Sequence, residues 1–158
     1  MTVTLRPTVE SHIWELSDTM RLADVIEVGL AREGSPFQVL SESVACTKDA
    51  ITAVDEEGLV IAIYGCSFGE GYAFPWMLSS PLVQHHGVEA VRLARAFVRS
   101  WLSEARAKNI PMLCNYVNRE NHSARRFIQA MGFTIFQSPG PGPFDFFYQL
   151  CANPQPSC

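Results

Sequence analysis

Apolar and polar positions in the first third of the chain follow mainly helical spacing. Residues 3–7 alternate between the two kinds, which predicts a short strand. Residues 8–33 carry apolar side chains at steps of three and four, which predicts helix in two pieces. Ser35 and Pro36, an N-cap residue followed by a first-turn proline, predict a further helix that ends near Cys46. The apolar stripe over residues 8–33 comprises Ile13, Leu16, Met20, Ala23, Ile26 and Leu30.

The middle of the chain combines strands with one long helix. Residues 49–68 are typical of two strands joined by a turn at 56–58, and residues 71–78 predict a third strand. Ser80 and Pro81 repeat the cap-and-proline pattern and predict the start of the long helix. The side chains expected to face inward from this helix are Val88, Val91, Ala94, Val98, Trp101, Leu102 and Ala105.

The last third alternates between strand and helix. Residues 111–117 form a short apolar run of the buried-strand type, and residues 118–133 contain a helix. Residues 133–136 and 144–150 predict two final strands, while residues 151–158 are expected to be a loose tail.

The order of these elements predicts one domain over residues 1–150 with an α+β architecture. A meander of antiparallel strands is followed by a strand–helix–strand crossover, which produces a mixed, mostly antiparallel sheet. With helices on its faces, the sheet belongs to the three-layer type.

Composition narrows the classes of partner. Of the 158 residues, 47% are hydrophobic and only 18% are charged, below the roughly 25% typical of globular domains. A surface with few charges is only a weak indication of a partner interface. The formal net charge of −4 gives no electrostatic reason to expect nucleic acid or an anionic membrane as a partner. No apolar run approaches the ~18 residues of a membrane span, and the N-terminus lacks a signal-peptide pattern, so we expect a cytoplasmic protein.

The five cysteines indicate neither a disulfide framework nor a zinc site. Their number is odd, and none are spaced as a C-x-x-C pair. We therefore expect buried free thiols, with Cys158 exposed at the end of the chain. His85 and His86 are adjacent and would point apart on a helix, so they predict surface histidines and no metal site.

Two stretches carry candidate chemistry. In QHHGVE (residues 84–89), a glycine precedes a predicted helix, so that backbone N–H groups and the positive helix end could hold a pyrophosphate. In NRENHSARRFIQAMGF (residues 118–133), Asn121 precedes an amphipathic helix that stops at Gly132 and Phe133. A capped amphipathic helix alone would explain the second stretch.

Taken together, the element order and these motifs resemble the GNAT acetyltransferase family. One family motif reads Asn-x-x-Ala followed at a fixed distance by Gly-Phe, and Asn121, Ala124, Gly132 and Phe133 match it. The resemblance implies a GNAT-like sheet with a splay between the fourth and fifth strands. It also implies acetyl-CoA as co-substrate, an amine as acceptor, and Asn121 beside the pantetheine arm.

The family's pyrophosphate motif is matched only in part. Gln84 and Gly87 fit it, but Glu89 occupies a position where the family has a small residue, and its carboxylate would repel an anionic pyrophosphate. The resemblance implies a cofactor-binding set that comprises Leu78, Gln84, His85, His86, Gly87, Val88, Asn115, Asn121 and Ala124.

The candidate general acid and general base match the family pattern less well than the cofactor motifs do. Family enzymes commonly place a tyrosine seven residues after the motif asparagine, where this chain has Ile128, which has no proton to donate. Tyr116 is the nearest substitute as the acid, although a tyrosine packed with its hydroxyl in water is the alternative. Glu70, just before the fourth strand, is the candidate base.

A narrower resemblance covers about residues 70–150. It is to small GNAT-like proteins of short-tailed phages, which include internal virion proteins, and it implies a phage origin and a place in the infected bacterial cytoplasm or the virion. The matching residues are Trp76, Leu78, Pro81, Asn115, Tyr116, Val117, Asn121, Arg125, Phe127, Gly132 and Phe133.

Two functions follow from these resemblances. One is an acetyl-CoA-dependent N-acetyltransferase that acts on a host or phage amine. The other is a GNAT-fold structural, internal virion or host-interaction protein that has lost turnover.

Overall fold

The computed structural model describes residues 2–151. Cys158 and the rest of the predicted tail from residue 152 lie outside the described residues. The described chain forms two compact units, and each is treated by itself below. Unit 1 joins the chain up to Ser67 with Trp76–Ala90, and unit 2 joins Phe68–Pro75 with the chain from Val91 onward. The single domain over residues 1–150 stays a prediction.

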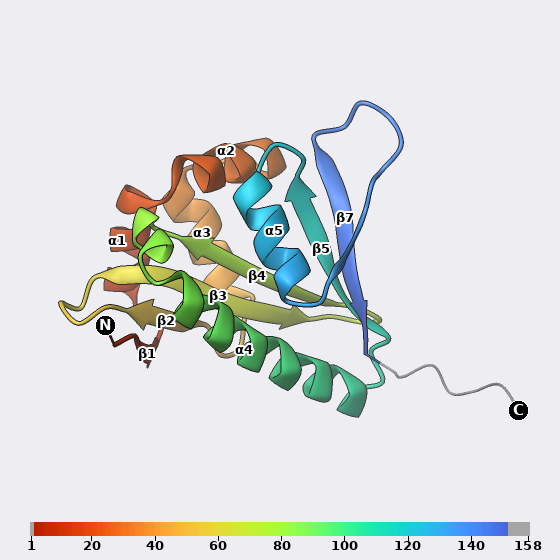
Figure 1. Ribbon diagram of the computed structural model, residues 1–158, viewed down its shortest axis with the longest axis horizontal. Coiled ribbons are helices and arrows are strands. Elements are labelled where there is room, and N and C mark those ends of the chain that lie inside the picture. Colours follow the sequence, from red (N-terminus) through yellow and green to blue (C-terminus); the bar gives the residue numbers. More distant parts are fainter. Residues whose placement is uncertain (1, 152–158) are drawn as a thin grey trace, which may run out of the picture. The chain divides into compact units, whose positions relative to one another are not determined.

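The strands confirm the predicted sheet, which is mixed and mostly antiparallel (Figure 1). Their hydrogen-bonded order is β1-β2-β3-β4-β5-β7-β6. The pairs β1–β2, β2–β3, β5–β7 and β6–β7 are antiparallel, and β4–β5 is parallel. The strands are β1 (Thr4–Pro7), β2 (Ile51–Val54), β3 (Val60–Phe68), β4 (Ala73–Ser79), β5 (Met112–Asn118), β6 (Thr134–Phe136) and β7 (Phe144–Leu150).

The helices also follow the predicted order, with one insertion. A 3₁₀ helix precedes the long helix α4, where the sequence predicted a single continuous element. The helices are α1 (Glu10–Thr19), α2 (Leu22–Ala31), α3 (Pro36–Ala45), η1 (Pro81–Gln84), α4 (Gly87–Ala107) and α5 (His122–Ala130). None of the helices in residues 2–151 is both long and apolar enough to cross a membrane.

In unit 1, the break between α1 and α2 changes which side chains are buried. Met20 leaves helical geometry with ψ 140°, so α2 starts anew with a different face toward the core. Its buried residues are Asp24 and Val28, whereas Ile26 and Leu30 are exposed. The predicted stripe is therefore confirmed for α1 and wrong for α2, because periodicity does not continue across a non-helical residue.

The core of unit 1 is closed by an aromatic side chain over a glycine. A Cβ atom at Gly65 would lie 2.6 Å from the ring of Trp76, so only glycine fits beneath the indole. The Trp76 indole N–H donates to Thr47 Oγ1 at 2.9 Å, which satisfies its polar atom. Residues packed in this core include Leu16, Leu40, Val60, Ile63 and Leu78.

The long helix begins later than the sequence predicted. Pro81 opens the short η1 helix, and α4 starts only at Gly87. Val88 therefore lies in the first turn with 89% of its surface exposed, which contradicts its predicted inward position. Farther along α4, the predicted inward residues Ala94, Val98, Leu102 and Ala105 are buried.

In unit 2, β5 and β7 lie side by side along their whole length (Figure 1). The shorter β6 pairs with the other edge of β7. Helix α5 follows β5 and ends at Ala130. Gly132, two residues later, has a φ of 93°, which is the left-handed conformation expected for a C-terminal stop. The Phe133 N–H reaches back to the Ile128 carbonyl at 3.3 Å and completes this stop.

Candidate functional site

The parallel pairing of β4 with β5 is confined to one place in unit 2. Ala73 is the partner of Leu113, and no further pair joins the two strands in the described chain. Two residues farther along, the Asn115 side-chain amide donates from Nδ2 to the Pro75 carbonyl at 3.0 Å. Its Oδ1 accepts the Tyr116 backbone N–H at 2.8 Å. A hydrogen bond from the Asn115 side chain thus replaces the next backbone hydrogen bond between β4 and β5.

Proline explains why the ladder stops at this point. A strand residue directs its N–H and C=O toward the same neighbour, and the Pro75 carbonyl faces β5. Pro75 has no backbone N–H and therefore cannot donate the next ladder hydrogen bond to β5. Because Pro75 is buried, a water molecule does not supply that hydrogen bond instead. The predicted splay between the fourth and fifth strands is therefore encoded by Pro75 and Asn115. A proline inside a predicted central strand was the signal that sequence reasoning missed.

The turn that follows β5 is closed by its own side chains. Asn118 Oδ1 accepts the Glu120 N–H at 2.8 Å, and the Asn118 carbonyl accepts the Asn121 N–H at 3.1 Å. Asn121 is 4% exposed and caps α5, because its Oδ1 accepts the Ala124 N–H at 3.3 Å. The Asn-x-x-Ala spacing is thus at least a helix cap. Residues 118–124, from the end of β5 to the first turn of α5, are called the β5–α5 turn below.

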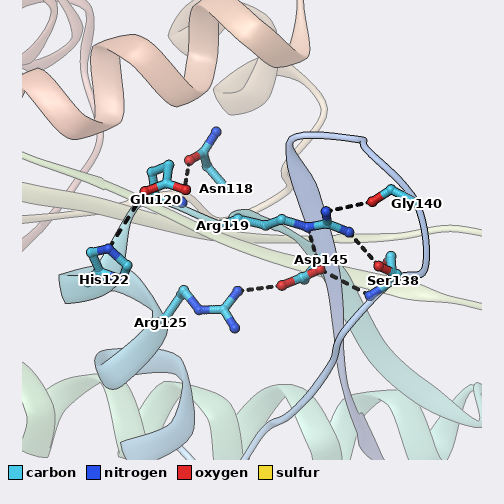
Figure 2. Close-up of polar contacts among 8 residues, drawn as sticks. All are labelled: Asn118, Arg119, Glu120, His122, Arg125, Ser138, Gly140 and Asp145. Carbon is cyan, nitrogen blue, oxygen red and sulfur yellow. Dashed lines mark hydrogen bonds and ion pairs between the residues drawn. The ribbon is translucent and has the colours of Figure 1, made fainter.

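A buried carboxylate anchors the same region (Figure 2). Asp145, on β7, is 2% exposed, and its Oδ1 accepts from Arg119 Nε at 2.9 Å and from the Ser138 N–H at 3.0 Å. Its Oδ2 accepts from an Arg125 guanidinium nitrogen at 2.7 Å. Arg119 also donates to the Gly140 carbonyl at 2.8 Å, so one carboxylate and two guanidiniums connect three segments of unit 2.

The charges in this cluster control the ionisation of Asp145. Burial raises the pKa of its carboxyl, but the hydrogen bonds from Arg125, the Ser138 N–H and Arg119 outweigh burial and hold the pKa below its ordinary value. Asp145 is therefore a structural anion at neutral pH, and its low pKa does not suit a general base.

Unit 1 presents a second strand-to-helix connection, residues 79–90, called the β4–α4 segment below. Asp24 on α2 is 5% exposed, and its Oδ2 accepts both the N–H and the hydroxyl of Ser79 at 3.2 Å. Arg21 binds the same carboxylate at 2.7 Å and donates its backbone N–H to the Ser79 carbonyl. The start of the segment is thereby fixed to α2. Neither Asp24 nor Arg21 was singled out from the sequence.

The end of the β4–α4 segment is open. The first helical bond of α4 runs from the Ala90 N–H to the His86 carbonyl at 2.8 Å. Gly87 and Val88 precede it, and among the described residues their N–H groups make no backbone–backbone hydrogen bond. A Cβ atom built at Gly87 meets no atom within 4 Å, so the space beside this backbone is free. Open donors at a positive helix end suit an anionic ligand.

The other predicted residues of this segment lie in different surroundings. Gln84 and His85 are exposed, and Leu78 is half-buried against the unit 1 core. His86 is 8% exposed, so the prediction of a surface histidine holds for His85 and is wrong for His86. Because the 3₁₀ turn interrupts the predicted helix, His86 turns inward.

The acid–base candidates both belong to unit 2. Tyr116 is 59% exposed, and its ring meets Phe146 edge-on at 5.5 Å between centroids. Glu70 is exposed in the turn before β4. Ile128 lies on α5 and is partly buried. Within the described residues, no group of three or more His, Cys, Asp or Glu side chains could hold a metal ion.

The cysteines fit the expectation of buried thiols with one exception. The thiols of Cys66, Cys114 and Cys151 are buried, whereas the thiol of Cys46 is exposed. Cys46 terminates α3, where the chain leaves the helix toward solvent.

No family model matches the chain, and no curated protein matches its sequence. Solved structures do match. A GNAT superfamily phosphinothricin acetyltransferase from Sinorhizobium meliloti, in complex with AcCoA, is 16% identical with a TM-score of 0.64, and the match covers 95% of this chain and 89% of that one. A GNAT-family acetyltransferase from Bacillus anthracis is 12% identical with a TM-score of 0.65 and 96% of each chain covered.

A third match is the PaiA N-acetyltransferase of Thermoplasma acidophilum, in complex with coenzyme A. It is 12% identical with a TM-score of 0.62, and the match covers 95% of this chain and 99% of that one. Likeness at these identities establishes the fold. The chain therefore has the mixed α/β fold of the GNAT acetyltransferases, including the parallel β4–β5 splay.

Proposed function

We propose that this protein binds acetyl-CoA and transfers its acetyl group to an amine. The observation that carries the proposal is the end of the β4–β5 ladder, where Pro75 cannot donate and Asn115 replaces the backbone partner. The three solved structures described above share the fold, and two of them hold AcCoA or coenzyme A.

The pyrophosphate is assigned to the open end of the β4–α4 segment. The N–H groups of Gly87 and Val88 would donate to it, and the free space beside Gly87 admits a close approach. Glu89 lies in the first turn of α4 and opposes binding, because its carboxylate is near the same helix end. Gln84, His85 and His86 complete the segment, with Leu78 at its strand end.

The chemistry is assigned to unit 2. Acetyl-CoA, when bound, supplies an acyl thioester. Tyr116 would give its hydroxyl proton to the departing thiolate, and Glu70 would accept the proton that the amine loses. Asn115 and Asn121 would orient the pantetheine amides, with Ala124 leaving room at the first turn of α5.

The decisive experiment is a thermal shift titration with acetyl-CoA. We expect the melting temperature to rise and to saturate at micromolar ligand, because binding only to the folded state stabilises it. Gly87→Trp should abolish the rise, because its side chain would block the proposed pyrophosphate site, and circular dichroism checks that the variant is folded. Glu89→Gln should strengthen binding. An unchanged melting temperature at millimolar acetyl-CoA contradicts the proposal.

Turnover is tested separately by the release of free thiol in the presence of a panel of primary amines. Tyr116→Phe removes the proposed acid while keeping the ring contact with Phe146. It should lower kcat and leave the thermal shift intact. Equal rates in wild type and Tyr116→Phe would remove Tyr116 from the assignment.

A second function is favoured by Ile128 and Glu89, which replace an acid and a small residue of the family motifs. In this reading the protein keeps the GNAT fold as a phage structural, internal virion or host-interaction protein without turnover. It should then co-sediment with phage particles or procapsids, and Asn121→Ala should leave plating efficiency unchanged. A chain absent from purified particles and from host complexes contradicts this alternative.

A further inference from the structure

Charge is divided unevenly between the two units. Unit 1 has twelve Asp and Glu residues against four Arg and Lys, a formal net charge of −8. Unit 2 has eight Arg and Lys residues against four Asp and Glu, a formal net charge of +4. The net charge of −4 on the whole chain therefore hides a basic unit, and a basic unit within an acidic chain points to an anionic partner.

We infer that an exposed arginine cluster of unit 2 binds an acidic segment of a partner protein. The cluster, called the arginine face, comprises Arg95, Arg99 and Arg106 on α4 and Arg126 on α5. The inference concerns a protein partner and does not depend on the proposed acetyl transfer.

Three of these arginines share one side of α4. Arg99 follows Arg95 by four residues, and Arg106 follows Arg99 by seven, which are the spacings of a single helix face. Ala96 and Ser103 lie on the same side, and all five side chains are exposed. At a rise of about 1.5 Å per residue, the row extends about 16 Å along the helix. The small side chains between the arginines leave a partner room to approach.

Helix α5 adds the fourth arginine to this row. Arg95 donates from Nε to the Ala130 carbonyl at 3.2 Å, so the end of α5 lies beside α4 (Figure 1). Arg126 is exposed and lies one turn before Ala130 on the same side of α5. Arginines from two helices therefore contribute to one surface of unit 2.

The acidic side chains of unit 2 do not neutralise the arginine face. Asp145 binds Arg119 and Arg125, and Glu104 pairs with Lys108 at 3.0 Å. Among the described residues, no carboxylate forms an ion pair with any of the four arginines of the face. Their positive charge is therefore available to a partner.

Backbone carbonyls orient two of the four arginines without cancelling their charge. Arg95 contacts the end of α5, and Arg106 donates from Nε to the Cys151 carbonyl. A guanidinium that is already held loses less side-chain entropy when it binds a carboxylate. Arg92 also lies on this side of α4 but is left out of the face, because Glu89 is three residues before it in the same helix.

The surroundings of the face favour protein carboxylates over nucleic acid. Guanidinium groups bind both carboxylates and phosphates through paired N–H donors. The aromatic residues of α4 within unit 2, Phe97 and Trp101, stack on each other with centroids 5.8 Å apart and lie on a different side of the helix from the arginine row. They are therefore not placed to stack on bases beside the arginines. The net charge of −8 on unit 1 opposes a long polyanion, whereas a short acidic segment can pair with the arginine face alone.

The spacing of the arginines suits an acidic helix. Carboxylates repeated at every third or fourth position of a helix lie about 5–6 Å apart, which is the spacing of Arg95 and Arg99 on α4. Such a helix lying along α4 would pair its carboxylates with successive arginines of the row. The partner is therefore expected to be a helical segment rich in Asp or Glu along one side.

Fluorescence anisotropy with a labelled Glu–Ala peptide, about 15 residues long with Glu at every third or fourth position, tests the inference on the full chain. We expect saturable binding at about 50 mM salt that weakens steeply by about 300 mM, because exposed ion pairs are screened. The same peptide with Gln in place of Glu should not bind. Arg99→Glu combined with Arg126→Glu should weaken binding at least about tenfold, since two attractions become repulsions.

The matched control is Arg6→Glu combined with Arg32→Glu. It makes the same change in net charge at two exposed arginines of unit 1 and should keep the wild-type affinity within about twofold. Circular dichroism checks that both double variants are folded. Saturating acetyl-CoA should leave the peptide affinity unchanged, and the acetyl-CoA thermal shift should be the same in the Arg99→Glu, Arg126→Glu variant as in the wild type. The acidic-partner and acetyl-transfer proposals can therefore fail independently.

Four results overturn the inference. One is equal affinity for the Glu and Gln peptides, and another is an equal loss of binding in the two double variants. Tighter binding of a single-stranded RNA of the same length than of the Glu peptide would assign the face to nucleic acid. Displacement of the Glu peptide by acetyl-CoA would assign it to the phosphates of the cofactor.

Discussion

The β5–α5 turn and the β4–α4 segment differ in how the backbone N–H groups at the start of the helix are hydrogen-bonded. In the β5–α5 turn, Asn118 and Asn121 bind the N–H groups of Glu120 and Ala124 with their own side chains. In the β4–α4 segment, the N–H groups of Gly87 and Val88 make no backbone–backbone hydrogen bond among the described residues, and a Cβ atom at Gly87 would meet no atom within 4 Å. In the β5–α5 turn, protein side chains satisfy these N–H groups without a ligand. In the β4–α4 segment, the N–H groups of Gly87 and Val88 could donate to an anionic ligand.

This difference separates structural support from the ligand binding that we propose. Asp145, Arg119 and Arg125 hold the closed connection and its neighbouring loop in place. Asp24 holds only the start of the open connection, through Ser79. Substitutions in the closed connection should therefore change stability first, whereas those at the open end should change ligand binding first.

The largest effect is expected for Asp145→Ala. It removes a buried carboxylate and leaves two guanidiniums without their shared partner, which should lower the free energy of unfolding by roughly 3 kcal/mol. Urea denaturation measures the change. Glu120→Gln is the matched control, because the Glu120 carboxylate is exposed and its pairing with His122 is a 3.8 Å surface contact. If both variants lose the same stability, Asp145 is not the anchor.

The pH dependence of the same anchor follows from its lowered pKa. A carboxyl whose pKa is lower in the folded state contributes stability above its unfolded pKa of about 3.9. That contribution is lost as the pH falls through the folded value. The stability difference between wild type and Asp145→Asn should therefore be largest near neutral pH and shrink below about pH 4. A difference that stays constant down to pH 3 contradicts the ionic role.

A smaller effect is expected at the helix cap. Asn121→Ala removes the acceptor of the Ala124 N–H and should cost about 1 kcal/mol by thermal or urea denaturation. Asn121→Ser keeps a capping oxygen and should restore most of that stability. If Asn121 also orients the pantetheine arm, the serine variant will still show a weakened acetyl-CoA shift. Full recovery of both would confine Asn121 to capping.

The smallest effect on stability is expected at the open end. Gly87→Ala should leave the free energy of unfolding unchanged within about 0.5 kcal/mol, since its added Cβ meets no atom within 4 Å and alanine favours a helix. Its acetyl-CoA affinity should nevertheless fall, because the methyl group would occupy the proposed path of the pyrophosphate. Undiminished affinity, measured by isothermal titration calorimetry, would move the pyrophosphate away from Gly87.

Sequence patterns predicted local structure correctly where the residues that determine it all lie within one short segment. Ser35 caps α3 through the Gln38 N–H, and Gly132 ends α5 with a positive φ, as their residue types predict. The pattern failed at Val88 and in α2, because a 3₁₀ turn and a non-helical residue shifted the helical phase in ways that apolar spacing does not record.

Local sequence patterns predicted the order of the elements and the mixed sheet, because these depend on periodicity, caps and turns that each span a few residues. The GNAT-like fold was implied by a motif resemblance and not by those patterns. Only the tertiary structure brought Asp145 to Arg119 and Arg125, Asp24 to Ser79, and the Pro75 carbonyl to Asn115. These partners are 20 to 55 residues apart along the chain, and their pairing depends on strand register and burial. No local spacing carries that information, so the open and closed connections became distinguishable only in the folded chain.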